Sequence, residues 1–81
     1  MDDVVKINVL FFGKLSDKFG TRELEIPLFA GNSINDLAKR LQIYDMLESG
    51  TKVALNGELC SPETEIPDAA EVAFLPPVSG G

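Results

Sequence analysis

Apolar and polar residues alternate in two stretches near the beginning of the chain, which predicts two β-strands. In the first, Val5 to Phe12, one face is apolar throughout, and the other begins with Lys6 and ends with Phe12. The second runs from Arg22 to Leu28. Pro27 favours an edge position for it, because proline has no amide hydrogen to donate to a further strand. The two strands are expected to form a hairpin with a long connection.

A helical period replaces the alternation after Ser33. Ser33 and Asp36 fit a capping box, in which each residue's side chain bonds the other's backbone amide. The apolar residues that follow have the spacing of one helix face: Ile34, Leu37, Ala38 and Leu41. Shorter helical turns are predicted at 15–19 and 43–47. One main helix with one wet face is therefore expected.

The second half of the chain predicts three more strands. Residues 52–55 and 58–60 flank Asn56-Gly57, a two-residue hairpin signal, because both central positions need positive φ. A last strand follows at 71–75. One helix covering a mixed sheet of four or five strands predicts an α+β protein with the β-grasp (ubiquitin-like) fold, in which the first and last strands are central neighbours. A ferredoxin-like fold would need a second full helix.

Strand alternation also predicts which side chains are buried. The expected core under the helix consists of Ile7, Val9, Phe11, Leu24, Ile26, Leu37, Leu41, Val72 and Phe74. On the opposite sheet face, Phe12, Leu59 and Leu75 are expected to form an exposed apolar patch of the kind that marks a partner site.

The composition indicates one globular domain: 81 residues, 44% hydrophobic and 25% charged. No apolar run approaches the ~20 residues of a membrane span. The acidic start, Met1-Asp2-Asp3, is unlike a secretory signal, and one cysteine allows no internal disulfide. We therefore expect a cytoplasmic protein without a membrane partner. The net charge of −6 argues against nucleic acid and suits a basic docking surface, or serves solubility alone.

The residue inventory excludes most catalytic chemistry. Without histidine there is no imidazole base, and one cysteine leaves no zinc site. No phosphate-binding glycine loop is present. We expect no metal and no bound cofactor, and a chain that is not an enzyme on its own.

The C-terminal segment is the strongest functional signal. After the last strand come Pro76-Pro77-Val78-Ser79-Gly80-Gly81. The prolines stop the sheet and stiffen the exit, whereas Gly80 and Gly81 are thin. We expect a domain over residues 1–75 and a tail over 76–81. The tail would reach at most ~20 Å and carry a carboxylate into another protein's active site.

With this fold and tail, the chain resembles the small subunit of molybdopterin synthase, the MoaD family of ubiquitin-like sulfur carriers. The segments that carry the resemblance are Val9 to Leu15, Gly20, Asn56-Gly57-Glu58 and, most specifically, Glu71 to Gly81. Two positions depart from the family. Ser16 stands where an arginine is frequent, and Asp68-Ala69-Ala70 stands where a turn commonly reads Asp-Gly-Asp.

The resemblance implies a mechanism. An ATP-dependent, ubiquitin-activating-type enzyme would adenylate the Gly81 carboxylate, and a sulfur donor protein would convert it to a thiocarboxylate. The large synthase subunit would supply the catalytic groups, and the assembly would be a heterotetramer. The tail would sulfurate cyclic pyranopterin monophosphate, with Gly80 needed to pass a narrow tunnel. The residues expected to bind the partner are Phe12, Leu59, Leu75, Pro76, Pro77, Val78 and Ser79.

Three alternatives stay open. Cys60 is a competing site for sulfur, although it fits a small strand residue better. The chain could carry sulfur for thiamine or tRNA thiolation, or it could be a protein modifier joined to lysines through Gly81. Lys14 and Arg22 are interpreted as solvated charges rather than binding groups.

Overall fold

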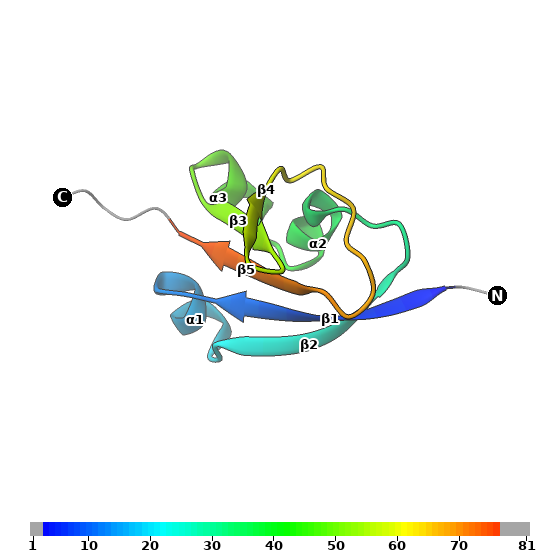
Figure 1. Cartoon of the computed structure of the whole chain (residues 1–81). Helices are drawn as coiled ribbons and strands as arrows, with labels where there is room; N and C mark the ends of the chain where they lie inside the picture. Colours follow the sequence, from blue (N-terminus) through cyan, green and yellow to red (C-terminus); the bar gives the residue numbers. More distant parts are fainter. Residues whose placement is uncertain (1–2, 77–81) are drawn as a thin grey trace.

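The computed structural model describes residues 3–76 and contains five strands and three short helices within them (Figure 1). Each element lies within one residue of its predicted boundaries. In chain order they are β1 (Val4–Phe11), α1 (Lys14–Phe19), β2 (Glu23–Phe29), α2 (Ile34–Arg40), α3 (Tyr44–Glu48), β3 (Lys52–Leu55), β4 (Glu58–Cys60) and β5 (Glu71–Leu75).

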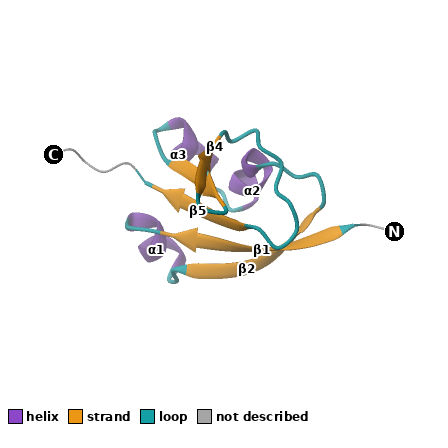
Figure 2. Cartoon of the chain, in the orientation of Figure 1, coloured by secondary structure: helices purple, strands orange, loops and turns teal. Residues whose placement is uncertain are grey.

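The five strands form one mixed sheet in the order β2-β1-β5-β3-β4. The central strands β1 and β5 are parallel, and the other neighbouring pairs are antiparallel. This is the β-grasp arrangement, so the predicted fold class is confirmed. Strand β2 lies at an edge, as Pro27 predicted. Figure 2 shows α2 beside the sheet and α1 at the end of β1.

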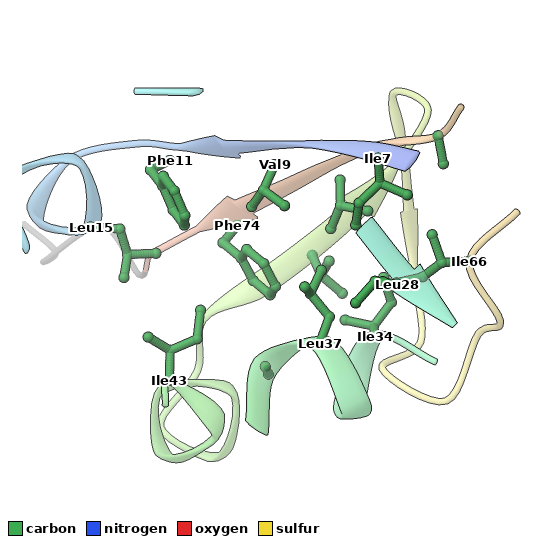
Figure 3. Packing of buried hydrophobic residues seen from close by; sticks show 14 of the residues in the cluster. Ile7, Val9, Phe11, Leu15, Leu28, Ile34, Leu37, Ile43, Ile66 and Phe74 are labelled. Atoms are coloured by element: carbon green, nitrogen blue, oxygen red, sulfur yellow. The ribbon is translucent and has the colours of Figure 1, made fainter. Parts of the chain in front are cut away.

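The core lies between the sheet and α2 (Figure 3). Phe11 on β1 and Phe74 on β5 are register partners and are 1% and 0% exposed. The buried set also includes residues that the expected core did not: Val5, Leu15, Leu28, Ile34, Ala38, Ile43, Val53, Ile66 and Ala70.

Three expected core residues are only partly buried. Leu24 and Ile26 pack against the cluster but keep some exposure, because β2 is an edge strand and has a neighbour on one side only. Leu41 is partly buried because it is the C-cap of α2, where the helix ends. The predicted face of each is right, and the predicted full burial is wrong.

Two local signals are confirmed in detail. The Ser33 hydroxyl accepts a hydrogen bond from the Asp36 backbone N–H at 3.3 Å, and the Asp36 carboxylate accepts one from the Ser33 backbone N–H at 2.9 Å. This is the capping box of α2. In the β3–β4 hairpin, Asn56 and Gly57 have φ of 51° and 88°, as a type I′ turn requires.

No helix among residues 3–76 is long and apolar enough to cross a membrane. The boundary between the domain and the tail was predicted at residue 76, the last described one. The division into 1–75 and 76–81 therefore stays a prediction.

Candidate functional site

The tail begins at the middle of the sheet. Strand β5 lies between β1 and β3, and its last residue, Leu75, is paired with Lys52. Pro76 follows and is partly buried. The remaining residues predicted for the tail, Pro77, Val78, Ser79, Gly80 and Gly81, lie outside the described residues. The structure thus places the root of the tail between the turn after β1 and the start of β3.

The turn after β1 lies directly against this root. Gly13 has a φ of +57°, and a β-carbon built on it would lie 3.3 Å from Cγ of Pro76. Gly13 entered the sequence analysis only as part of the Val9–Leu15 segment. A glycine directly after a strand was the available signal, but the contact with Pro76 joins residues 63 positions apart and has no local signature.

Apolar side chains on the sheet face opposite the helix surround the same end of β5. Phe12 is 46% exposed and Leu59 65% exposed, as expected. Leu75 is only partly buried instead of fully exposed, because β5 is a central strand with a neighbour on each side. Whether these residues bind a partner stays a prediction.

The strand register places further apolar residues on the same sheet face, among them Ala54, which is only 8% exposed. A row of paired residues crosses four strands: Leu10 on β1, Ala73 on β5, Ala54 on β3 and Leu59 on β4. The two alanines are small, so the larger side chains stand on either side of them. We call Leu10, Phe12, Ala54, Leu59, Ala73 and Leu75 the outer apolar face. Leu10, Ala54 and Ala73 were not among the predicted site residues.

Charged residues border the outer apolar face. Glu23 on β2 continues the row beyond Leu10, and Lys52 is paired with Leu75. In the next row, Asn8 lies between Glu25 and Glu71. These three residues help to line a hollow of about 440 Å³. Carboxylates therefore border the outer apolar face toward β2 and toward the beginning of β5. Lys52 borders the same face next to Leu75, where the tail begins.

The competing sulfur site, Cys60, lies away from the tail root. It is a partly buried free thiol on β4, two strands from β5, and its register partner is the buried Val53. It helps to line a hollow of about 340 Å³ that extends to Leu59 of the outer apolar face and to Lys52. This placement favours the structural interpretation of Cys60. Among residues 3–76, no three His, Cys, Asp or Glu side chains are grouped as a metal site requires.

Comparisons with known proteins point to one group. The ThiS family model matches residues 9–81. The molybdopterin synthase sulfur carrier subunit of Chlamydomonas reinhardtii is 35% identical over 83 residues, which cover 95% of this chain and 100% of that relative. A chain in the solved complex of subunits 1 and 2 of the molybdopterin-converting factor from Helicobacter pylori is 27% identical, with a TM-score of 0.62 and coverage of 95% and 100%.

A second solved structure is similar over the same length. The small archaeal modifier protein 1 from Methanosarcina acetivorans is 27% identical, with a TM-score of 0.68, and the match covers 96% of this chain and 98% of that one. Proteins of two functional classes therefore share this fold and this length.

Proposed function

Because the chain belongs to the ThiS family and to the MoaD family of molybdopterin synthase sulfur carrier subunits, we propose that it carries sulfur on the carboxylate of Gly81 for molybdopterin synthesis. The observation that carries this proposal is the exit of β5 from the centre of the sheet, beside the outer apolar face, into a segment ending in Gly80-Gly81. A partner seated on that face would meet the root of the tail at the same time.

The proposed chemistry begins with activation. A carboxylate is a poor electrophile, so its oxygen first attacks the α-phosphate of ATP on an activating enzyme, and pyrophosphate leaves. The terminal sulfur of a donor persulfide then attacks the acyl adenylate, and AMP leaves. A second thiol reduces the resulting acyl disulfide, which releases the Gly81 thiocarboxylate and a donor disulfide. The thiocarboxylate sulfur is a good nucleophile at neutral pH, as thiolates are.

The acceptor in this proposal is cyclic pyranopterin monophosphate, bound by a large synthase subunit. That subunit supplies the acid–base groups, since this chain has no histidine and its described residues present no grouped metal ligands. In each transfer the thiocarboxylate sulfur displaces an oxygen substituent from an acceptor carbon, and water then cleaves the acyl–sulfur bond, which returns the Gly81 carboxylate and leaves the sulfur on the acceptor. One dithiolene therefore needs two carriers that each bear a thiocarboxylate, which fits a heterotetramer with two copies of each subunit.

The direct test is the intact mass of the protein after incubation with an activating enzyme, ATP and a persulfide donor. The expected product is heavier by the difference between one sulfur and one oxygen atom, and the change maps to the C-terminal peptide. A control without ATP should give no shift. Sulfur found on Cys60 would overturn the proposal.

A protein modifier is the second candidate, favoured by the similarity to the small archaeal modifier protein. A modifier forms an amide between Gly81 and a lysine of a target, whereas a carrier regains its free carboxylate. Affinity purification under denaturing conditions distinguishes them. Covalent adducts with Gly81 joined to lysine would favour the modifier, and one non-covalent partner lost on denaturation would favour the carrier.

A further inference from the structure

The turn between β1 and α1 has a backbone conformation that only glycine adopts readily. Gly13 has φ of 57° and ψ of −130°. Its carbonyl accepts hydrogen bonds from the Ser16 backbone N–H at 3.1 Å and from the Ser16 hydroxyl at 2.8 Å. The Leu15 N–H donates to the carbonyl of Phe12 at 3.1 Å. These bonds hold the peptide groups on both sides of Gly13, so the conformation of the turn is determined by its neighbours.

This turn lies close to the first residue after β5. A β-carbon on Gly13 would stand 3.3 Å from Cγ of Pro76, tighter than most contacts of real β-carbons. A larger residue at position 13 would therefore both strain the backbone and push the proline ring aside. Phe11 and Phe74, each two residues before the contact, are paired and buried, so the two strands themselves cannot move apart easily.

We propose that Gly13 is a positioning residue for the C-terminal carboxylate: the Gly13–Ser16 turn acts as a guide that sets the direction in which the chain leaves β5. Proline has a fixed φ, so the orientation of the Pro76 ring constrains the backbone that follows it. The turn acts on the reaction through Pro76 and touches no reacting atom. The kinetic consequence of this inference rests on the proposed function. The direction in which the chain leaves β5 does not depend on that function.

The length of the chain beyond the guide makes its direction important. Five residues follow Pro76, and in extended form they span at most ~17 Å. A change of ~15° at Pro76 would then move the end by about 4 Å. A wrongly directed tail lowers the fraction of docked complexes in which Gly81 enters the partner's active site. At saturating carrier, kcat therefore falls by that fraction, whereas KM changes little because complexes with a misdirected tail still form.

The test measures direction without relying on sulfur transfer. Cys60 is the one cysteine, so spin labels on Cys60 and on a Ser79→Cys substitution report a distance distribution by pulsed electron resonance. Position 79 is three residues beyond Pro76, at most ~10 Å away, so Gly13→Ala should shift the mean distance by about 2–3 Å. Gly20→Ala is the matched control: Gly20 also has positive φ, +70°, but a β-carbon there meets nothing within 4 Å. It should lose stability and leave the distribution in place.

Two further variants keep the proposal testable if Gly13→Ala does not fold. Pro76→Ala removes the ring that meets Gly13, and Ser16→Ala removes the hydroxyl bond to the Gly13 carbonyl. Neither adds atoms to the turn, and both should broaden the distribution. In the double variant Gly13→Ala/Pro76→Ala, the mean distance between the labels should shift less than it does in Gly13→Ala alone. Unchanged distributions in Pro76→Ala and Ser16→Ala would overturn the guide, and so would an unchanged one in a folded Gly13→Ala.

The kinetic consequence is measured separately. With the activating enzyme, Gly13→Ala should lower kcat about tenfold with KM nearly unchanged, because only the competent fraction of docked complexes falls. A rise in KM with unchanged kcat would contradict a positioning role, because it would place the effect on docking. If the distances shift but the parent protein forms no thiocarboxylate, the guide stands and the proposed function fails. If the thiocarboxylate forms and no variant changes the distances, the guide fails alone.

Discussion

Phe11 and Phe74 are register partners on the two parallel central strands, and both side chains are buried under the helix layer (Figure 3). Phe11 also stacks on Phe19 of α1, with ring centroids 4.2 Å apart. The buried pair Phe11 and Phe74 thus lies where β1 and β5 are paired, just before β5 ends. Phe11 also packs α1 against β1 through its stacking on Phe19. The root of the tail is therefore attached to the most deeply buried part of the core.

Truncating one ring of this pair should be costly. Phe74→Ala is expected to lower the free energy of unfolding by ~3–5 kcal/mol, because it leaves a cavity that the surrounding strands cannot fill. Urea denaturation followed by circular dichroism measures the loss. Phe29→Ala is the control, since Phe29 is 60% exposed and its truncation should change little. Similar losses in both variants would contradict the assigned core.

The outer apolar face should contribute to partner binding and little to folding. Phe12→Ser is expected to leave the unfolding free energy within ~0.5 kcal/mol of the parent value, since Phe12 is 46% exposed. Its affinity for the large synthase subunit should fall at least tenfold, as for an apolar residue central to an interface. Isothermal titration calorimetry measures the affinity, and urea denaturation measures the unfolding free energy. Phe29→Ser removes a more exposed ring (60%) at the far end of the sheet and should leave the affinity unchanged. Equal affinities in all three proteins would refute the docking role.

The reactive group should be the carboxylate of Gly81. Deleting Gly81, replacing Gly80 with valine, or adding a residue after Gly81 should abolish sulfur transfer without changing the melting temperature, because glycine has no side chain to bury in a core. Cys60→Ala should retain nearly full transfer. Molybdopterin formation in a reconstituted reaction is the measurement. Activity in the Gly81 deletion would exclude the mechanism.

Ala69 is a site where a glycine should stabilise the fold. Its φ is 61°, a conformation that costs an L-residue with a β-carbon free energy. The surrounding turn is held by its N–H, which donates to the Lys6 carbonyl at 2.9 Å. Ala69→Gly is expected to raise the unfolding free energy by about 1 kcal/mol. The control is Ala30→Gly, at an exposed position without positive φ, which should bring no gain. If Ala69→Gly and Ala30→Gly change the melting temperature equally, the backbone at Ala69 is not strained.

The capping box of α2 should make stability depend on pH in the acidic range. The hydrogen bond from the Ser33 backbone N–H is the main cause that lowers the pKa of Asp36 below its ordinary value of 3.8. Burial opposes it as the next largest effect, and the Ser33 hydroxyl and the charge of Lys39 add to the lowering. The folded pKa lies below the unfolded one, so the carboxylate stabilises the fold above the unfolded pKa. This contribution disappears as pH falls through the folded value. Asp36→Asn should therefore melt earlier than the parent protein at pH 6, and the difference should narrow below pH 3.8. A constant difference would contradict the assignment.

The sequence alone determined the elements of this protein, because their signals are local. Alternation placed the strands, the Ser33–Asp36 pair marked the start of α2, and Asn56-Gly57 specified the β3–β4 turn. Each depends on the φ, ψ or side-chain preferences of residues within about four positions of one another, so no distant contact was needed. The tail motif was also local, and its family resemblance led to the role proposed for Gly81.

Only the tertiary structure decided which residues surround the root of the tail. The row from Leu10 through Ala73 and Ala54 to Leu59 exists because four strands pair in one register, and Ala73 is far in sequence from both Leu10 and Ala54. The same pairing leaves Leu75 partly buried and brings Gly13 against Pro76. Alternation gives each strand two faces, but the offset between strands depends on the packing of all the strands and helices together. The surface that presents the tail is therefore a property of the whole sheet.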